Sequence, residues 1–272
     1  MSHRKLPDNR RGCLPGVLNA LIVGGIRASA LMLRAIIFDL FETLITESRT
    51  QPAGVTSLAP QLGCERDAFR TQWNALRPAV TVGRISFRQA VSNIAARLGG
   101  HADEDIVQRL CEERTRAKAE PFAQVEHEVL MIVDYLRSRN LRLGIISNCF
   151  AEDVAAWPLC SLASRFDGTV FSFQVGLAKP DPEIYVEATG RLRVDPAEAW
   201  FIGDGGQDEL SGARQAGLRA FRALWFLKRW RHFREEPCSA ASLVDFEEVV
   251  SLVEQAMGPR GGLRTMRSTH PE

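Results

Sequence analysis

Five short apolar runs, rich in branched side chains and without polar alternation, constrain the fold of this chain more than any other feature. They span residues 33–40, 141–147, 169–173, 199–203 and 218–224. Continuous apolar runs of this length are typical of strands that are covered on both faces. Stretches with helical periodicity separate most of the runs, so the sequence predicts an α/β domain built on a mainly parallel sheet.

Helical periodicity dominates the segment between the first and second strand runs. Residues 46–120 contain three stretches with apolar side chains at helical spacing, at 62–76, 87–98 and 106–119, and no convincing strand. This pattern predicts an inserted all-helical domain. Further helices are expected over residues 122–136 and from Asp181 to Leu192, because both stretches combine an early proline with one apolar face.

These patterns divide the chain into four parts. We expect a leader at residues 1–32, an α/β core at 33–47 and 120–257, a helical cap at 48–119 and a disordered tail at 258–272. Arg10 and Arg11 precede an apolar stretch that imitates a signal peptide, although prolines and glycines dilute it. We therefore expect a cytoplasmic protein, and export by the leader stays open as the alternative.

Charge and cysteine usage exclude several classes of function. The chain has 272 residues, with 34 basic and 33 acidic side chains. This balance creates no global field that would gather nucleic acid or an anionic membrane, so neither is an expected partner. The six cysteines form no CxxC pair and no zinc-binding spacing with histidine, which predicts reduced thiols. A small-molecule substrate is the expected partner.

Polar residues at the ends of separate strand runs, or in the loop before a helix, are the candidates for chemistry. In chain order they are Asp39, Thr43, Ser147, Asn148, Lys179, Asp204 and Asp208. Ligands of an open parallel sheet collect beyond the carboxyl ends of its strands. We therefore expect these residues to converge on one site.

The residue types at these positions suit phosphoryl transfer, which needs a nucleophile, a hard cation held by oxygen ligands, and donors for the phosphoryl oxygens. Asp39 would attack phosphorus and form an aspartyl-phosphate. Asp39 and Asp204 would hold Mg²⁺, with Asp208 in support. Ser147 and Lys179 would donate to the transferring group.

Four segments of the sequence, in this order, resemble the motifs of the haloacid dehalogenase superfamily. They read FDLFETL, IISN, GLAKPDPEIY and FIGDGGQDELSGARQAG. The resemblance implies a Rossmann-like parallel sheet with a smaller helical cap inserted after the first motif. It also implies that Asp39 is the nucleophile, that Lys179 is the stabilising cation, and that Thr43 and Ser147 contact the phosphoryl group beside Asn148.

Phe41 departs from the pattern of the superfamily's phosphatases, which typically carry there a second aspartate that protonates the leaving oxygen. The backbone carbonyl of Phe41 could still bind Mg²⁺ together with Asp39, Asp204 and Asp208, but its side chain moves no proton. A missing general acid typically removes a factor of about 10² to 10⁴ in rate. The neighbouring Glu42 is a candidate replacement.

Two other functions stay open beside the phosphatase hypothesis. An aromatic residue at position 41 also resembles metal-independent 2-haloacid dehalogenases, in which Arg70 would lie where an arginine binds halide or carboxylate. A binding protein that works through the basic, aromatic stretch at residues 225–234 is the third hypothesis. Close carboxylates such as Asp39 and Asp204 repel unless a cation neutralises them. We therefore expect a Mg²⁺-dependent phosphatase that acts on a small phosphorylated metabolite.

Overall fold

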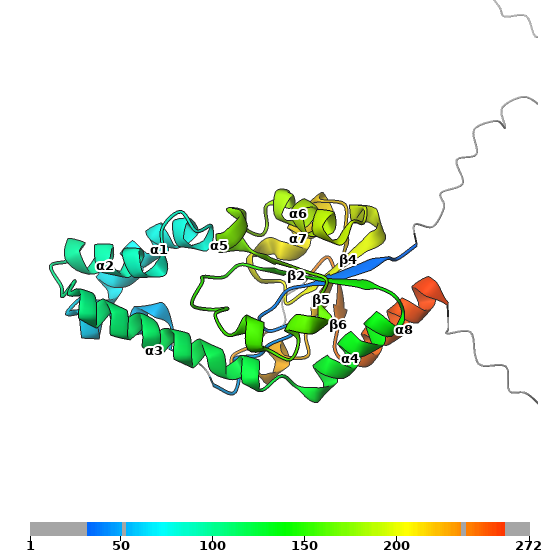
Figure 1. Cartoon of the computed structure of the whole chain (residues 1–272), viewed down its shortest axis with the longest axis horizontal. Coiled ribbons are helices and arrows are strands. Elements are labelled where there is room, and N and C mark those ends of the chain that lie inside the picture. The colour runs from blue at the N-terminus through cyan, green and yellow to red at the C-terminus, as the bar shows by residue number, and fades with distance from the viewer. Residues whose placement is uncertain (1–31, 51–52, 235–237, 259–272) are drawn as a thin grey trace, which may run out of the picture. The chain divides into compact units, whose positions relative to one another are not determined.

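Six parallel strands form the central sheet of the computed structural model, which describes residues 32–50, 53–234 and 238–258 (Figure 1). The strands are β1 (Ala35–Phe38), β2 (Arg142–Ser147), β3 (Gly168–Phe171), β4 (Ala199–Gly203), β5 (Arg219–Ala223) and β6 (Ala241–Leu243). The five predicted strands and the parallel sheet are confirmed. β6 was not predicted, because its three residues are too few to form an apolar run.

The spatial order of the strands reverses direction at β1. The order is β3-β2-β1-β4-β5-β6, so the chain builds outward through β2 and β3 and then crosses to the other side of β1. Phe38 at the end of β1 lies opposite Ile145 of β2 and Ile202 of β4. Ligand sites of open parallel sheets lie beyond the carboxyl ends of the strands at such a reversal.

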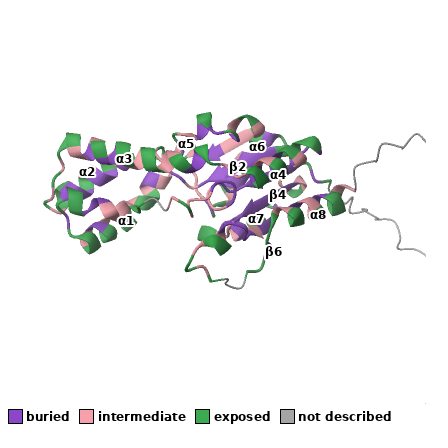
Figure 2. Ribbon diagram, turned by 90° about the horizontal axis from the view of Figure 1, so that it is seen from below, coloured by how far each residue is buried: buried purple, intermediate pink, exposed green. Residues whose placement is uncertain are grey.

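Helices cover both faces of the sheet, and the alternation of side chains along β1 assigns each face its own core. Ile36 and Phe38 join the hydrophobic cluster that includes α4 (His127–Ser138) and α8 (Phe246–Met257). Ala35 and Ile37 join the cluster that includes α6 (Pro182–Leu192) and α7 (Glu209–Gln215). Figure 2 shows β2 and β4 buried between helices whose outer sides are exposed.

Three helices inserted between β1 and β2 form the predicted cap around a hydrophobic cluster of their own. They are α1 (Arg66–Thr81), α2 (Phe87–Arg97) and α3 (Glu104–Ala123), and they lie together in Figure 1. Each begins at an acceptor side chain, because Glu65, Ser86 and Asp103 accept hydrogen bonds from the first-turn backbone N–H groups.

The predicted core helix at residues 122–136 is partly wrong. Phe122 belongs to the end of α3, and α4 begins only at His127. The apolar stripe continues across the break at residues 124–126, so periodicity alone could not locate it. α5 (Ser172–Val175) and short 3₁₀ turns at Val55–Leu58, Pro60–Leu62, Trp157–Leu159, Ala163–Arg165, Pro196–Glu198, Gly206–Asp208 and Leu227–Arg229 complete the fold.

The predicted leader and tail lie outside the described residues, apart from Met32 and Gly258. Within the described ranges, the helices are all too short or too polar to cross a membrane. The predicted domain boundaries stay predictions, and α3 runs past residue 119, where we expected the cap to end.

Candidate active site

Asp39 and Asp204 follow the two strands at which the sheet order reverses. The backbone N–H of Asp39 donates to the carbonyl of Ile202 over 2.8 Å, which extends the parallel pairing one residue beyond β1. Asp204 follows β4 directly, and its Oδ1 accepts a hydrogen bond from the Gly206 N–H over 2.8 Å. Gly205 adopts a φ of 93°, a left-handed conformation that glycine reaches without strain. The sheet therefore places both carboxylates at its carboxyl edge.

Lys179 joins this group from the loop before α6. Its Nζ contacts Oδ1 of Asp39 and lies 2.5 Å from Oε2 of Glu209, and all three side chains are buried. The other oxygen of Glu209 accepts a hydrogen bond from the Gly205 N–H over 2.9 Å. Glu209 thus holds both Lys179 and the turn that follows β4.

The pKa values of these groups reflect burial and shared charge. Burial raises the pKa of Asp39 to about 6 and that of Glu209 to about 8, and attraction to Lys179 offsets only part of the effect. Burial alone would lower the pKa of Lys179, but the two carboxylates outweigh it and raise that pKa above its ordinary value. Two buried carboxylates therefore share one ammonium, while the nearby Asp204 repels both.

The acidic residues at this edge suit a hard divalent cation. Asp39, Asp204 and Glu209 each offer one carboxylate oxygen, and these oxygens lie within 4.8 Å of one another. Oxygen ligands of this kind are the ones that Mg²⁺ prefers, and a bound cation would offset the repulsion that adds to the effect of burial on the pKa values of Asp39 and Glu209. The donor set therefore fits Mg²⁺.

Asp208 differs from its predicted position at the metal. Its backbone adopts a φ of 56°, and its side chain is exposed outside the group of three carboxylates. Glu209, one residue later, begins α7 and is buried beside Leu210. Sequence reasoning missed Glu209, because two adjacent acidic residues in a first helical turn give no signal of which one points inward.

Asn148 positions Lys179 through the backbone. The Lys179 N–H donates to Oδ1 of Asn148 over 2.8 Å, and Nδ2 of Asn148 donates to the Lys179 carbonyl over 2.8 Å. Nδ2 also donates to the side-chain oxygen of Gln207 over 2.8 Å. Both amide hydrogens of this predicted substrate-binding residue are therefore used within the protein.

Thr43 and Ser147 bring two buried hydroxyl groups to the neighbourhood of Asp39. Oγ1 of Thr43 is buried and has no hydrogen-bond partner among the described residues. The indole N–H of Trp225 donates to the Thr43 carbonyl over 2.9 Å and holds this loop in place. Ser147 ends β2, the strand next to β1, and is also buried. A buried hydroxyl without a partner is rare in folded proteins and suggests that a ligand supplies one.

The side chain of Phe41 contacts the cap helix α3. Its ring packs edge-to-face against Phe122, with 6.0 Å between the ring centroids, and Nζ of Lys118 lies 5.6 Å from the Phe41 ring centroid. Because Phe122 and Lys118 both lie on α3, this aromatic side chain joins the loop after β1 to the cap. It brings no group that transfers a proton.

The carboxylate of Glu42 accepts three hydrogen bonds. Its carboxylate accepts from Thr46 Oγ1 over 2.9 Å, from the Glu47 N–H over 2.8 Å and from the indole N–H of Trp230 over 2.7 Å. Burial raises the pKa of Glu42, and these donors act against that shift. The carboxylate thus braces the loop after β1, which argues against Glu42 as the replacement acid.

A cavity of about 420 Å³ opens between α1 and the core loops beside Lys179. Its lining includes Trp73, Arg77 and Thr81 from the cap and Asn148, Lys179 and Gln207 from the core. Sequence reasoning missed Arg77 and Gln207, because nothing in their local pattern shows which side of a helix or loop faces the core.

Arg70, the cap arginine that the sequence suggested, does not line this cavity. Its side chain is 57% exposed and forms an ion pair with Asp67 over 3.1 Å within α1. Arg77, two helical turns further along the same helix, lines the cleft instead.

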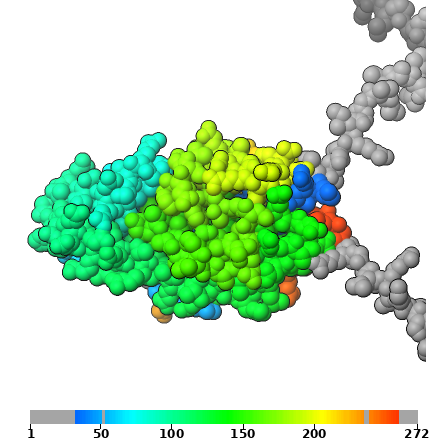
Figure 3. Space-filling model, in the orientation of Figure 1, coloured from blue at the N-terminus to red at the C-terminus, as the bar shows by residue number. Residues whose placement is uncertain are grey.

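Direct contacts join the cap to the core, and in Figure 3 the cyan and teal residues of the cap adjoin the green residues of the core. Oγ of Ser172 donates to the Thr81 carbonyl over 2.7 Å, and Arg114 of α3 forms a buried ion pair with Asp153 over 2.6 Å. A Cβ atom on Gly83 would lie 2.1 Å from the carbonyl oxygen of Phe173, so this approach of the two backbones requires glycine. The cap therefore packs closely on the core at the end of α1.

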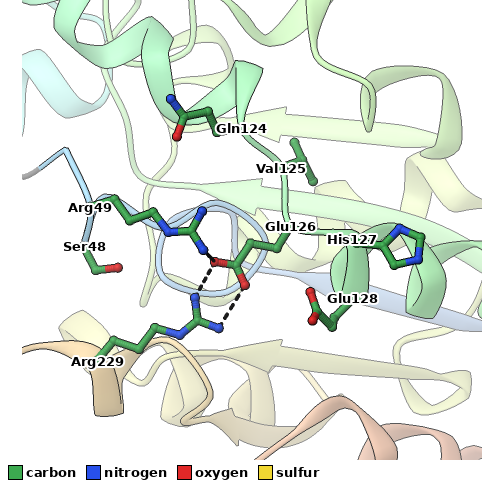
Figure 4. A pocket seen from close by; sticks show the side chains of 8 residues that line it. All are labelled: Ser48, Arg49, Gln124, Val125, Glu126, His127, Glu128 and Arg229. Carbon is green, nitrogen blue, oxygen red and sulfur yellow. Dashed lines mark hydrogen bonds and ion pairs between the residues drawn. The ribbon is translucent and has the colours of Figure 1, made fainter.

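A second cavity, of about 820 Å³, lies where the cap joins the core (Figure 4). Glu126 accepts hydrogen bonds from Arg49 over 3.0 Å and from both terminal nitrogens of Arg229, one of them over 2.9 Å. The lining of this cavity contains none of the candidate catalytic residues. The arrangement ties both connections of the cap to the segment after β5.

The basic, aromatic stretch at residues 225–234 combines aromatic side chains that contact the core with basic side chains that are exposed. Trp225 and Phe226 are buried, and Trp230 reaches Glu42. Lys228 and Arg231 are exposed. Trp225 and Trp230 hydrogen-bond to the loop after β1, whereas the basic side chains lie at the surface, so the hypothesis of a binding surface stays a prediction.

Comparison with known proteins agrees with this geometry. A model of haloacid dehalogenase-like hydrolases matches residues 33–217. The chain is 25% identical over 226 residues to a glyceraldehyde 3-phosphate phosphatase of Methanopyrus kandleri, covering 79% of this chain and 93% of that protein. It is 32% identical over 139 residues to a phosphoserine phosphatase of Thermus thermophilus, covering 49% of this chain and 53% of that protein.

Solved structures with a similar fold come from both kinds of enzyme. A 2-haloacid dehalogenase from Pseudomonas syringae superposes with a TM-score of 0.58 at 22% identity, covering 82% of this chain and 99% of that chain. A HAD phosphatase from Thermococcus onnurineus superposes with a TM-score of 0.57 at 18% identity, covering 81% and 98%. At this level of identity the likeness shows the fold alone.

Proposed function

Because the chain belongs to the haloacid dehalogenase-like hydrolases, we propose that it is a Mg²⁺-dependent phosphatase that acts on a small phosphorylated metabolite. The observation that carries the proposal is the group of three carboxylates formed by Asp39, Asp204 and Glu209. Asp39 and Glu209 also share the ammonium of Lys179. Such a group favours a bound cation, which a phosphatase of this kind would use and a metal-independent dehalogenase would not.

Asp39 would act as the nucleophile, because it lies at the carboxyl edge of β1 with its backbone fixed by β4. Its carboxylate would attack phosphorus as the bond to the leaving oxygen breaks, and the leaving group would depart as an unprotonated anion. Water would then hydrolyse the aspartyl-phosphate and release inorganic phosphate. Mg²⁺ held by Asp39 and Asp204, with Glu209 nearby and the Phe41 carbonyl as a further candidate ligand, would supply positive charge to the phosphoryl oxygens.

Lys179 would keep Asp39 ionised and would neutralise charge on the transferring group. Asn148 and Glu209 would hold Lys179 in place from its backbone and its ammonium, respectively. The hydroxyl of Thr43, which has no hydrogen-bond partner among the described residues, would donate to a phosphoryl oxygen, and Ser147 would donate from the end of β2. Asp208 has no role in this arrangement.

The absence of an acid at position 41 limits the leaving groups that a substrate can carry. The ring of Phe41 packs against Phe122, and the carboxylate of Glu42 accepts hydrogen bonds from three donors, so neither would protonate a leaving oxygen. A general acid typically contributes about 10² to 10⁴ in rate, and the benefit is largest for a basic leaving group. We therefore propose substrates whose leaving group is stable without a proton.

The second candidate is a 2-haloacid dehalogenase, which Phe41 favours because displacement of halide needs no leaving-group acid. Its substrate carries a carboxylate, which would have to approach Asp39, Asp204 and Glu209. Without a metal, the two buried members of this group share the ammonium of Lys179. The resulting repulsion makes the phosphatase the better supported proposal.

One paired assay separates the two candidates. Purified protein would be given an activated aryl phosphate with Mg²⁺ or with chelator, and separately a 2-haloacid without metal. The phosphatase proposal expects phosphate release only with Mg²⁺ and no halide release. Halide release in the presence of chelator would replace the proposal with the dehalogenase alternative.

A further inference from the structure

Arg77 lines the cleft as an exposed cation without an ion-pair partner among the described residues. It lies on α1, one turn before Thr81, whose hydroxyl donates to the Arg77 carbonyl over 2.9 Å. No ion pair found among the described residues includes Arg77. By contrast, Arg70 on the same helix is paired with Asp67. The guanidinium of Arg77 is therefore available to a ligand.

The rest of the cleft adds no charge that would compete for Arg77. The described residues that line the cleft include no acidic side chain. Lys179, the other charged residue of the lining, is already in contact with Asp39 and Glu209. The cleft therefore presents one unpaired positive charge on its cap side.

The remaining lining suits a small molecule that reaches from Lys179 toward the cap. Trp73 and Phe150 contribute aromatic surface to the lining. The side-chain amides of Asn148 and Gln207 are hydrogen-bonded to each other. A volume of about 420 Å³ is within the range that holds a small metabolite. Asp39 is not part of the lining, but it contacts Lys179, which is, so a ligand with its phosphoryl group at Asp39 would extend its other end past Lys179 along α1.

We propose that Arg77 selects substrates that carry a second anionic group at the end remote from the phosphoryl group. A guanidinium matches carboxylate and phosphate with two parallel hydrogen bonds, which gives direction as well as attraction. The proposal rests on the phosphatase function proposed above. It assigns substrate choice to α1 and leaves the chemistry to the core.

Binding of unreactive analogues tests Arg77 separately from turnover. Short linear phosphonates that end in a carboxylate, a second phosphonate or a neutral carboxamide would be titrated by calorimetry in the presence of Mg²⁺. We expect the wild-type protein to bind the two anionic analogues about tenfold more tightly than the carboxamide. The comparison of the two anionic analogues shows which anion the site prefers.

Variants of α1 then locate the preference. Arg77→Ala should bind all three analogues with the same affinity, and Arg77→Lys should keep part of the preference, because it retains the charge without the planar fork. Arg66→Ala, at the exposed start of the same helix and outside the cleft lining, is the matched control and should bind as the wild type does. Circular dichroism would verify that each variant is folded.

Equal binding of the three analogues by the wild type, or a preference that survives in Arg77→Ala, would overturn the proposal. Hydrolysis of the corresponding phosphate esters is measured in parallel. If the esters are not hydrolysed but the binding preference is present and depends on Arg77, the selective role of Arg77 stands and the phosphatase proposal fails.

Discussion

The Lys179 ammonium lies 2.5 Å from the Glu209 carboxylate, and the same lysine contacts Asp39. Glu209 therefore helps to position the ammonium of Lys179, although its neighbour Asp208 was the functional residue proposed from the sequence. Removing the charge of a residue that positions a catalytic ammonium weakens charge stabilisation at the reaction centre. This relationship leads to the first prediction.

Glu209→Gln should lower kcat/KM on an aryl phosphate by about 10- to 100-fold, because Lys179 loses one of its two charged partners. Asp208→Asn removes the adjacent exposed carboxylate and should change kcat/KM by less than about twofold. Steady-state kinetics of the two variants at saturating Mg²⁺ make the comparison. A larger loss in Asp208→Asn than in Glu209→Gln would restore Asp208 as the functional residue.

Stability in the absence of metal should fall as the pH rises. Burial raises the pKa of Asp39 to about 6 and that of Glu209 to about 8, from ordinary values near 4. Between those limits the folded protein holds more protons than the unfolded chain, so the free energy of unfolding decreases with rising pH. Mg²⁺ binds the ionised carboxylates and should therefore raise Tm more at about pH 8 than at about pH 5.

Thermal unfolding with chelator and with Mg²⁺ at both pH values measures this effect. Glu209→Gln removes one of the two titrating groups and should flatten the dependence on pH. An increase in Tm on adding Mg²⁺ that is the same at both pH values would contradict the assignment of these carboxylates to the cation.

Thr43→Val should separate stability from activity. The Thr43 hydroxyl is buried without a partner among the described residues, so an isosteric apolar side chain removes an unsatisfied group. We expect the free energy of unfolding to stay within about 1 kcal/mol of the wild type or to rise. Because the hydroxyl would donate to the phosphoryl group, kcat/KM should fall by about tenfold or more. Denaturant titration and kinetics of Thr43→Val would test both statements, and unchanged kinetics would make the hydroxyl incidental.

Phe41→Asp should increase turnover of substrates with poor leaving groups more than of those with good ones. The new carboxylate would stand where the ring now packs against Phe122, near the ammonium of Lys118. Proton donation matters most when the leaving oxygen is basic. Rates for a series of aryl phosphates of increasing phenol pKa measure the effect.

Phe41→Asn is the matched control for this series, because asparagine is similar to aspartate in size and polarity but transfers no proton. Equal changes in rate across the series for Phe41→Asp, or the same pattern in Phe41→Asn, would show that the missing acid does not limit the reaction.

The sheet and its carboxyl edge could be predicted because most strands have a recognisable apolar run and parallel pairing places the ends of the strands together. Continuous apolar runs identified five of the six strands, and the polar residues at their ends included Asp39 and Asp204. Parallel strands bring such residues together whatever lies between them in sequence. β6 and the exact break between α3 and α4 escaped prediction, because neither changes the apolar pattern.

The remaining members of the site depend on orientation, which a single sequence does not determine. Glu209 and Asp208 are adjacent, and only the start of α7 decides which one is buried. Arg70 and Arg77 lie on one helix, yet the packing of the cap on the core brings only Arg77 to the cleft. Glu42 was a candidate acid from the sequence, but its carboxylate accepts a hydrogen bond from the indole of Trp230, which is distant in sequence.

The dependence of aryl phosphate hydrolysis on Mg²⁺, measured for the wild type and for Asp39→Asn, tests the central claim most directly. The account predicts a rate that rises to saturation with Mg²⁺, disappears with chelator and is absent from Asp39→Asn at every concentration of the metal. A wild-type rate that chelator leaves unchanged, or substantial hydrolysis by Asp39→Asn, would contradict it.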